Sequence, residues 1–327
     1  MRTLFYPALF LALALGCAAA PPQPAQAAPA FKLPVQDKAK SIAETVYNTW
    51  RVSMQRGNES SWRSSTSTAR QTKIRNMIVS QKQAFPGDLF RKQPPPPALE
   101  NFRFVGALAG AQGQTMACTY LGSLQLGDGD PAPNAYVLQL VCERGSWKLD
   151  QANFFRLDKL PKVLKRLEAK DLSVLQEQDG FRPYASVPAA PAACKAPELI
   201  GKVFVDCPGR SVELRINGIS THRFADERRA DVISGGLRRG QNNISYHINP
   251  VAGQPHPSFA IGIFVMPETP GNRPVCVFDH ILDAEDKAEG GSFTFSIDNA
   301  AIGSMNPKYT GPKPEPLHAV PLKPKKP

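Results

Sequence analysis

The chain has 327 residues, 42% of them hydrophobic, and a formal net charge of +11. This length exceeds what one hydrophobic core normally fills, so a single small domain is excluded and two modules are expected. The 32 prolines are about twice the usual share, and their clusters at 21–34, 94–97, 183–197 and 307–327 indicate module boundaries.

The positive charge is unevenly distributed along the chain. Residues 28–182 carry 22 Lys and Arg against 14 Asp and Glu, residues 183–307 carry 11 against 13, and residues 308–327 carry five against one. A basic surface outside the cytoplasm attracts anionic lipid and acidic polymers through its long-range field. The alternative is that this charge only keeps the protein soluble.

The N-terminus has the pattern of an export signal. Arg2 precedes an apolar run over residues 4–15, which is long enough for a signal peptide and too short to span a bilayer. We therefore expect residues 1–28 to be a signal segment and the protein to be extracytoplasmic. Nucleic acid is a poor match as a partner for such a protein.

Two processing points follow the apolar run, and they imply different locations. The segment from Ala14 to Cys17 resembles a bacterial lipobox, although that pattern prefers Leu at the first position and a small residue at the second. Lipidation of Cys17 would tether the protein to the envelope through the Ala/Pro-rich stretch 29–35. Ala25-Gln26-Ala27 instead suits ordinary signal peptidase and a periplasmic protein. Both alternatives stay open.

Two amphipathic helices are predicted at the start of the first module. Apolar residues recur at helical spacing over 37–56, and Gly57 stands where a C-terminal cap belongs. A second helix is predicted to begin at Thr68, with Gln71 completing a capping box, and to end before Pro86.

Strands with alternating apolar residues follow the prolines at 94–97. They are predicted at 101–109, 114–126, 135–145 and 147–155, and a helix is predicted at 160–178.

A disulfide is predicted within this group of strands. A hairpin with its loop at 127–134 is centred near residue 130, which places Cys118 opposite Cys142 on the apolar face. The alternative is two buried free thiols. Pairing of Cys194, Cys207 and Cys276 stays open.

The element order resembles a known α+β architecture. Helices followed by a meander of antiparallel strands, with a Gly-x-Trp-Lys turn at 145–148, resemble the ketosteroid-isomerase-like cone, also named after nuclear transport factor two, over residues 35–157. The resemblance implies a curved sheet around a long helix, with a pocket that some members use for chemistry and many for binding or pairing.

The residues of this module argue against catalysis. Residues 28–182 contain no histidine, and Asp150 is predicted to point with Lys148 away from the apolar face, so no buried acid or base is expected. The side chains predicted in the interior of this module are mainly aromatic. The candidate ligand-pocket residues are Trp50, Trp62, Tyr120 and Trp147, and the alternative is that they form the core.

A Pro/Ala-rich linker over 181–197 leads to a second, all-β module. Asn217-Gly218 supplies the two positive-φ positions of a type I′ hairpin turn. Strands are predicted at 202–207, 211–217, 219–224, 243–248, 259–266, 274–281 and 292–297. This spacing resembles an immunoglobulin-like sandwich, and the L-x-x-G-x-N stretch at 237–242 resembles a turn of bacterial surface sandwiches.

The second module offers few functional residues. The pairs Arg228-Arg229 and Arg238-Arg239 are a candidate anion-binding patch. The alternative is that they are solvent-exposed charges that prevent strand pairing at a sheet edge. Carbohydrate binding needs exposed aromatic rings, but the module lacks Trp and its aromatic residues are predicted in the core. Scattered histidines and an acidic loop at 283–289 without calcium spacing predict no metal and no cofactor.

These patterns predict an α+β chain, a cone module of helices and a curved antiparallel sheet followed by an all-β sandwich. The predicted layout is signal 1–28, tether 29–35, cone module 36–180, linker 181–197, sandwich 198–305, and a disordered Pro/Lys tail 306–327. We expect a non-enzymatic envelope protein that binds a partner protein or an anionic polymer, with membrane contact only through a lipid on Cys17. The alternatives are a carrier or isomerase for a small apolar ligand, and a carbohydrate-binding sandwich.

Overall fold

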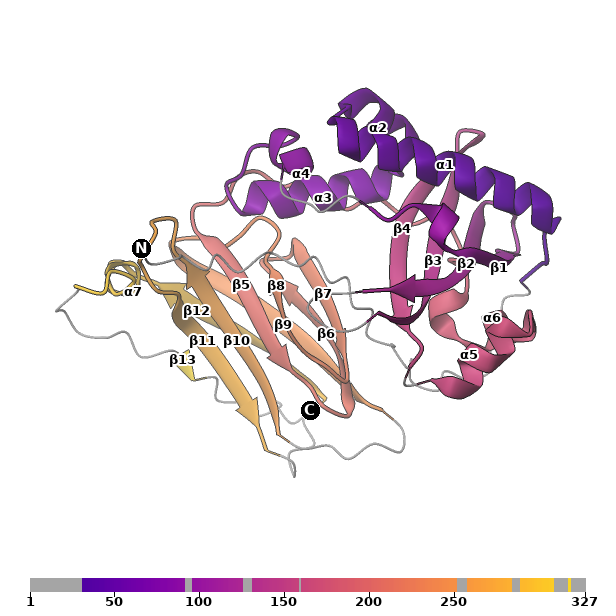
Figure 1. Cartoon of the computed structure of the whole chain (residues 1–327). Coiled ribbons are helices and arrows are strands. Elements are labelled where there is room, and N and C mark those ends of the chain that lie inside the picture. The colour runs from indigo at the N-terminus through magenta and orange to yellow at the C-terminus, as the bar shows by residue number, and fades with distance from the viewer. Residues whose placement is uncertain are drawn as a thin grey trace.

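The computed structural model describes residues 31–91, 96–125, 131–158, 160–251, 258–283, 289–308 and 317–318. The chain is an α+β protein in which a helical N-terminal part and one sheet are followed by two further sheets (Figure 1). The predicted signal segment, Cys17 and most of the acidic loop lie outside the described residues. Within the described part, no helix is long and apolar enough to cross a membrane.

The N-terminal half contains the predicted helices and strands. Its elements are α1 (Gln36–Arg56), α2 (Glu59–Ser65), α3 (Thr68–Ser80), α4 (Gly87–Arg91), β1 (Arg103–Ala109), β2 (Thr115–Leu124), β3 (Ala132–Glu143), β4 (Ser146–Arg156), α5 (Pro161–Glu168) and α6 (Ser173–Glu177). The short helices α2 and α4 were not predicted. The helix predicted at 160–178 is two helices, with Lys170 between them at φ +57°.

The helix caps confirm one prediction and correct another. Gly57 ends α1 in the left-handed conformation and its N–H donates to the Ser53 carbonyl, as expected. The N-cap of α3 is Ser67, one residue before the predicted Thr68, and its hydroxyl accepts from the Arg70 N–H at 3.0 Å. The capping box was wrong because the Thr68 hydroxyl is used elsewhere, donating to Glu143 at 2.8 Å.

The register of the first sheet overturns the predicted disulfide. Strands β1 to β4 form an antiparallel meander in which Cys118 pairs with Leu138 and Cys142 with Trp147. The β2–β3 hairpin is therefore centred near residue 128 rather than 130, which moves the residue opposite Cys118 by four positions. Both cysteines are free thiols.

Thiol labelling tests this correction. We expect that, under non-reducing denaturing conditions, a maleimide reacts with all five cysteines from Cys118 to Cys276, each of which is a free thiol. In the native protein Cys118 should stay unlabelled, because burial raises the pKa of its thiol and hides it from reagent. Mass spectrometry of the intact chain reads the labels. Only three labels after denaturation would restore the disulfide.

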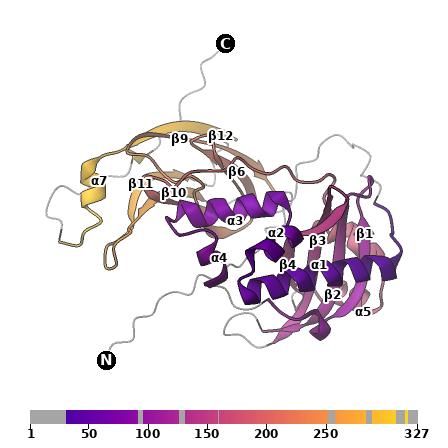
Figure 2. The same cartoon turned by 90° about the horizontal axis from the view of Figure 1, so that it is seen from above.

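Helices cover both faces of the first sheet. Helix α1 packs on one face around Tyr47, Trp50, Tyr136 and Leu140, and α5 and α6 pack on the other around Val137. Figure 2 shows α1 lying across the strands. The sheet is therefore buried on both sides, which explains the almost continuous burial of β3.

The C-terminal half consists of two sheets that share one hydrophobic core. Its elements are β5 (Ile200–Asp206), β6 (Arg210–Ile216), β7 (Ser220–Ala225), β8 (Arg228–Val232), β9 (Gly240–Pro250), β10 (Phe259–Met266), β11 (Val275–Leu282), β12 (Gly290–Ile297), α7 (Asn299–Gly303) and β13 (Leu317–His318). The sheet orders are β13-β11-β10-β5-β8 and β12-β9-β6-β7. Asn217 and Gly218 have φ of +50° and +69°, so the predicted hairpin turn is confirmed.

Candidate functional site

The aromatic residues proposed as a ligand pocket belong to the packed core between α1 and the first sheet. Trp50, Trp62 and Tyr120 are buried, and Trp147 is half-buried against the same core. Neighbouring rings fill the space, with centroids 5.5 Å apart for Tyr47 and Trp50. These rings therefore form the interior and do not present a binding surface.

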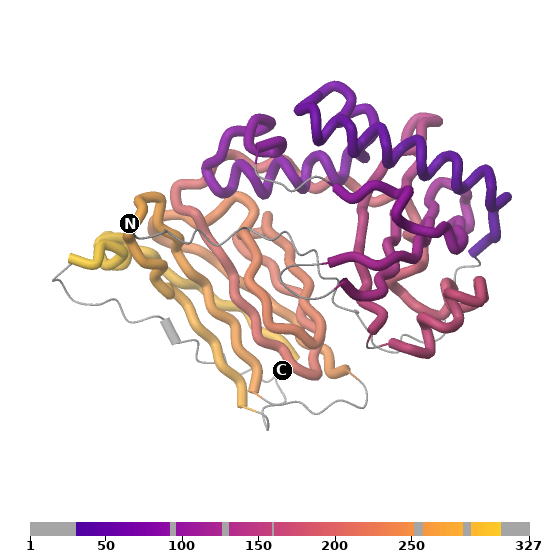
Figure 3. Tube along the Cα trace, in the orientation of Figure 1, coloured from indigo at the N-terminus to yellow at the C-terminus, as the bar shows by residue number. Residues whose placement is uncertain are grey.

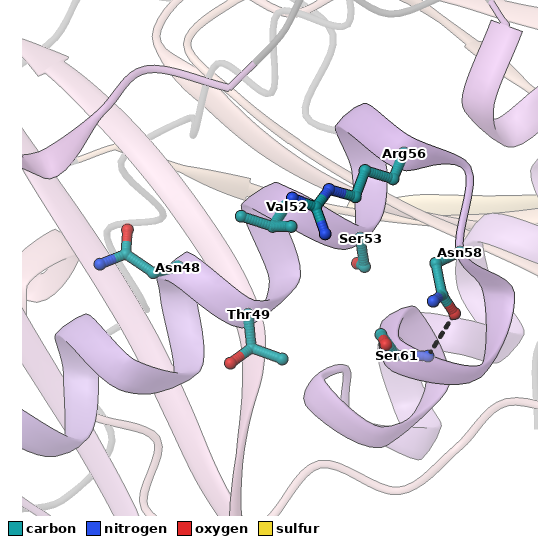
Figure 4. Close-up of a pocket in the computed structure, with 7 residues that line it drawn as sticks. All are labelled: Asn48, Thr49, Val52, Ser53, Arg56, Asn58 and Ser61. Atoms are coloured by element: carbon teal, nitrogen blue, oxygen red, sulfur yellow. Dashed lines mark hydrogen bonds between the residues drawn. The ribbon is translucent and has the colours of Figure 1, made fainter.

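A surface pocket of about 360 Å³ lies elsewhere, on the outer side of α1 where it meets α2 (Figure 4). Its lining is polar apart from Val52 and contains one cation, Arg56. Ser61 is held in place because its N–H donates to the Asn58 side chain at 3.0 Å. The lining residues are Asn48, Thr49, Val52, Ser53, Arg56, Asn58 and Ser61. The lining contains no His, Cys, Asp or Glu, the residue types that most often act as a general base, so what it offers a small ligand is hydrogen bonds and the charge of Arg56.

The carboxylate of Asp150 is buried, although the sequence predicted that this side chain points away from the apolar face. The β3–β4 ladder passes from Gln139–Gln151 to Leu140–Leu149, so Asp150 is the extra residue of a β-bulge. A bulge re-aims side chains, and Asp150 is only 4% exposed. Strict alternation predicted the opposite orientation because it assumed an unbroken ladder.

Asp150 joins the N-terminus of α3 to the edge of the sheet. The Ser67 hydroxyl donates to its carboxylate, and Arg70 Nη1 donates to its backbone carbonyl at 2.8 Å. The Arg70 guanidinium also lies 5.4 Å from the centre of the Trp50 ring. Burial lowers the pKa of Arg70, and the Asp150 carboxylate opposes this shift. The cluster contains a carboxylate and a guanidinium, but its hydrogen bonds are made within the protein and the Asp150 side chain is not accessible to a substrate. Its role is therefore to hold α3 against β4.

Two tyrosines extend the buried polar cluster. The Tyr136 hydroxyl donates to the Tyr47 hydroxyl at 3.0 Å, and the latter donates to the Pro97 carbonyl at 2.7 Å. Burial raises the pKa of Tyr47 to about 12. Burial likewise raises the pKa of Tyr136 well above its usual range, so both phenols are neutral hydrogen-bonding groups at physiological pH.

The second half contains Ser220, His222 and Asp231 in the order of a hydrolytic triad. Ser220 Oγ lies 2.7 Å from His222 Nε2, and His222 Nδ1 lies 3.4 Å from Asp231 Oδ2. Sequence reasoning missed it because no short motif joins β7 to β8. However, Ser220 is only 1% exposed and its oxygen already accepts the Ser234 N–H at 2.8 Å. The group therefore links the edge strands of the two sheets and offers no accessible nucleophile.

We expect Ser220 to be chemically silent and structurally important. A fluorophosphonate probe should not label the native chain, because the hydroxyl is enclosed. Ser220→Ala should lower the free energy of unfolding by about 1–3 kcal/mol, since the Ser234 N–H loses its acceptor. Chemical denaturation measures the loss. Labelling that disappears in Ser220→Ala would instead identify a hydrolase.

The two arginine pairs do not form one anion patch. Arg228 pairs with Asp206 at one end of the β5–β8 ladder, whereas Arg238 and Arg239 follow the opposite end. Arg229 is engaged at 3.1 Å by both Glu227 and Asp231. The candidate patch is therefore divided, and part of its charge is neutralised.

The stretch predicted as a linker is hydrogen-bonded to α3, and these bonds connect the two halves. Figure 3 shows the trace of α3 beside the C-terminal half. The Asn76 side chain donates to the Ala192 carbonyl at 2.8 Å and accepts the Cys194 N–H at 3.0 Å. Ser80 Oγ accepts the Gly235 N–H at 2.8 Å. We call α3 with these partners the junction. Sequence reasoning missed it because a polar helix side usually faces water.

Removing one junction side chain should loosen the link between the halves. In Asn76→Ala, the Ala192 carbonyl and the Cys194 N–H lose their partner, and we expect proteolysis between residues 183 and 197 to accelerate at least threefold. Limited proteolysis followed by mass spectrometry measures the rate. Lys73→Ala, at an exposed residue of α3, is the matched control. Equal rates in both variants would contradict the role of Asn76.

Comparisons with known proteins identify no relative: no family model, no curated protein and no solved structure matches the chain. Among the described residues, no group of three or more His, Cys, Asp or Glu side chains is placed to hold a metal ion.

Proposed function

We propose that the chain is an exported, non-catalytic envelope protein that binds a partner protein. The observation that carries the proposal is the use of Trp50, Trp62 and Tyr120 as core, because a ligand carrier or isomerase of the cone type needs that interior for its ligand. The two groups of residues with catalytic side-chain types, around Asp150 and His222, are enclosed and make structural hydrogen bonds.

A protein partner fits better than an anionic polymer. A polymer needs a continuous basic track, whereas Arg229 is neutralised by acids and Arg166 is bound by Asp171 and Glu177. The junction supports the same proposal, since a fixed arrangement of two halves lowers the entropic cost of binding a macromolecule. The proposal retains the cone and immunoglobulin-like resemblances and export through residues 1–28, with lipidation of Cys17 or cleavage after Ala27.

Native mass spectrometry of the protein extracted from its own envelope tests this function. After mild chemical crosslinking we expect a complex with a second polypeptide, and without crosslinking we expect a chain free of small-molecule adducts. A bound apolar adduct would overturn the proposal in favour of a carrier, and a bound oligosaccharide would favour a lectin. The denatured mass reports the lipid on Cys17 or a start near Ala28.

A further inference from the structure

The pocket on the outer side of α1 contains a cation that no acid neutralises. Arg56 lines the pocket, and within the part of the chain that the structure describes its guanidinium makes no ion pair and no hydrogen bond. The nearest acid along the chain, Glu59, is already engaged, because Arg63 Nη2 lies 2.7 Å from its carboxylate. The charge of Arg56 is therefore open to a bound group.

The side chain of Arg56 lies over the pocket and does not extend beyond the end of the helix. Figure 4 shows it running back along α1 toward Val52, which stands one helical turn earlier. This is the direction that long side chains usually take on a helix. A bound carboxylate would therefore meet the guanidinium, while the aliphatic part that carries it would meet the methyl groups of Val52.

Further hydrogen-bond donors come from the opposite wall of the pocket. The Asn58 oxygen accepts the Ser61 N–H at 3.0 Å, which leaves Asn58 Nδ2 as a donor, and the Ser61 hydroxyl makes no hydrogen bond among the described residues. Thr49 and Ser53 instead donate their hydroxyl protons to carbonyls of α1, at 2.8 Å and 2.6 Å. The unused donors of the lining are therefore those of Arg56, Asn58 and Ser61.

These features define the class of group that fits. One cation without an acid balances a single negative charge, whereas a phosphate monoester carries about 1.5–2 negative charges at neutral pH. The guanidinium also matches the planar shape of a carboxylate. The lining has no aromatic ring on which a sugar could stack, and a volume of about 360 Å³ is near the lower end of the range for ligand pockets. The pocket therefore suits one acidic side chain.

We propose that this pocket receives the carboxylate of an aspartate or glutamate side chain of the partner protein. Arg56 forms the ion pair, and Asn58 and Ser61 donate hydrogen bonds. The inference rests on the proposed protein-binding function. An exposed ion pair contributes little binding energy alone, so the pocket selects the partner and its orientation within a larger interface.

Two probes of nearly the same shape test the pocket in the full chain. N-acetylglutamate α-amide carries the carboxylate, and N-acetylglutamine α-amide is its neutral control. In a titration at constant ionic strength, we expect the glutamate probe to shift the backbone N–H signals of Asn58 and Ser61 in the NMR spectrum of the isotope-labelled protein. Its dissociation constant should be at least fivefold lower than that of the glutamine probe, because only the carboxylate pairs with Arg56.

Two variants locate that preference. Arg56→Gln should abolish it, whereas Lys38→Gln, which removes the same charge from an exposed residue at the other end of α1, should retain it. Circular dichroism checks that both variants are folded. Equal affinity of the wild-type chain for the two probes would overturn the proposal. A preference that persists in Arg56→Gln would also overturn it, and would leave Arg56 only the role of stabilising the C-terminal end of α1.

A coupling reaction in the native envelope identifies the group that occupies the pocket. Arg56→Lys places an amine in the pocket, and a carbodiimide activates carboxylates. The amine then attacks the activated carbonyl and a urea leaves with the former carboxylate oxygen, so an amide bond forms. We expect mass spectrometry to find position 56 joined to an Asp or Glu of a second protein, and Lys38 to remain unjoined to it.

The outcomes of this reaction separate the pocket from the proposed function. A partner that is recovered by general crosslinking but never joined at position 56 would overturn the pocket's role and leave the protein-binding function intact. Recovery of no partner by either method would contradict the protein-binding function itself. An amide only to Glu59 of the same chain, or only to a second copy of the chain, would overturn the proposed occupant.

Discussion

Replacing Asp150 by Asn should lower the free energy of unfolding by about 1–3 kcal/mol, although the two side chains have nearly the same shape. Asp150 is the carboxylate that opposes the effect of burial on Arg70, whose Nε has no hydrogen-bond partner among the described residues. Without the negative charge, the guanidinium stays buried and uncompensated. Chemical denaturation measures the change.

Two comparisons establish the cause of that loss. Asp158→Asn removes a carboxylate from a surface pair with Arg156 and should cost less than about 1 kcal/mol. The double variant Arg70→Met/Asp150→Asn should be less destabilised than the sum of its single variants by roughly 1–3 kcal/mol, because no isolated charge remains. A cost for Asp150→Asn no larger than that of the surface control would contradict the role of the cluster.

The protein should lose stability steeply above pH 10. Burial raises the pKa of Tyr47 to about 12 and raises the pKa values of Tyr120, Tyr136 and Tyr184 above the usual range. In the unfolded chain these phenols ionise near pH 10, whereas the folded chain retains their protons. The unfolded state therefore binds fewer protons, and the unfolding free energy falls by about 1.4 kcal/mol per pH unit for each tyrosine.

The direction of this pH dependence, and the pH range in which it occurs, follow from the raised pKa values of the four tyrosines. The stabilisation is fully present below pH 10 and is lost as pH rises toward 12, with a combined slope of up to about 5 kcal/mol per pH unit for four tyrosines. Denaturation curves at successive pH values measure it, and tyrosinate absorbance shows whether ionisation accompanies unfolding. Ionisation of these phenols in the folded chain near pH 10 would refute the expectation.

Tyr120→Phe provides a matched test of the alkaline behaviour. The Tyr120 hydroxyl is buried without a hydrogen-bond partner in the described part of the chain. Its removal should leave stability at neutral pH equal or higher by about 1 kcal/mol, because an unsatisfied polar group disappears. The same variant should reduce the alkaline slope by about one tyrosine's share.

Local sequence patterns predicted local structure well in this chain. The end of α1 at Gly57 and the turn at Asn217-Gly218 follow from residues that adopt positive φ more readily than others. Most strands of both halves follow from apolar patterns that depend only on neighbouring positions, whereas β8 and β13 were not predicted. Export, localisation and the division into modules stay predictions.

Predictions that depended on distant residues were wrong or incomplete. The disulfide failed because the hairpin centre was placed two residues too late, which moved Cys118 away from Cys142. The burial of Asp150 depends on a bulge in β4 and on Ser67, which lies 83 residues earlier in the chain. Neither the bulge nor the helix that covers it has a local sequence signal.

The junction also sets an order of events during biosynthesis. Asn76 finds its partner 118 residues later, at Cys194, and Ser80 finds its partner 155 residues later, at Gly235. While the chain is still emerging, α3 therefore has no means of reaching its final bonded state. The bonds of the junction can therefore form only after residues 194 and 235 have been synthesised, so this contact between the halves is completed late.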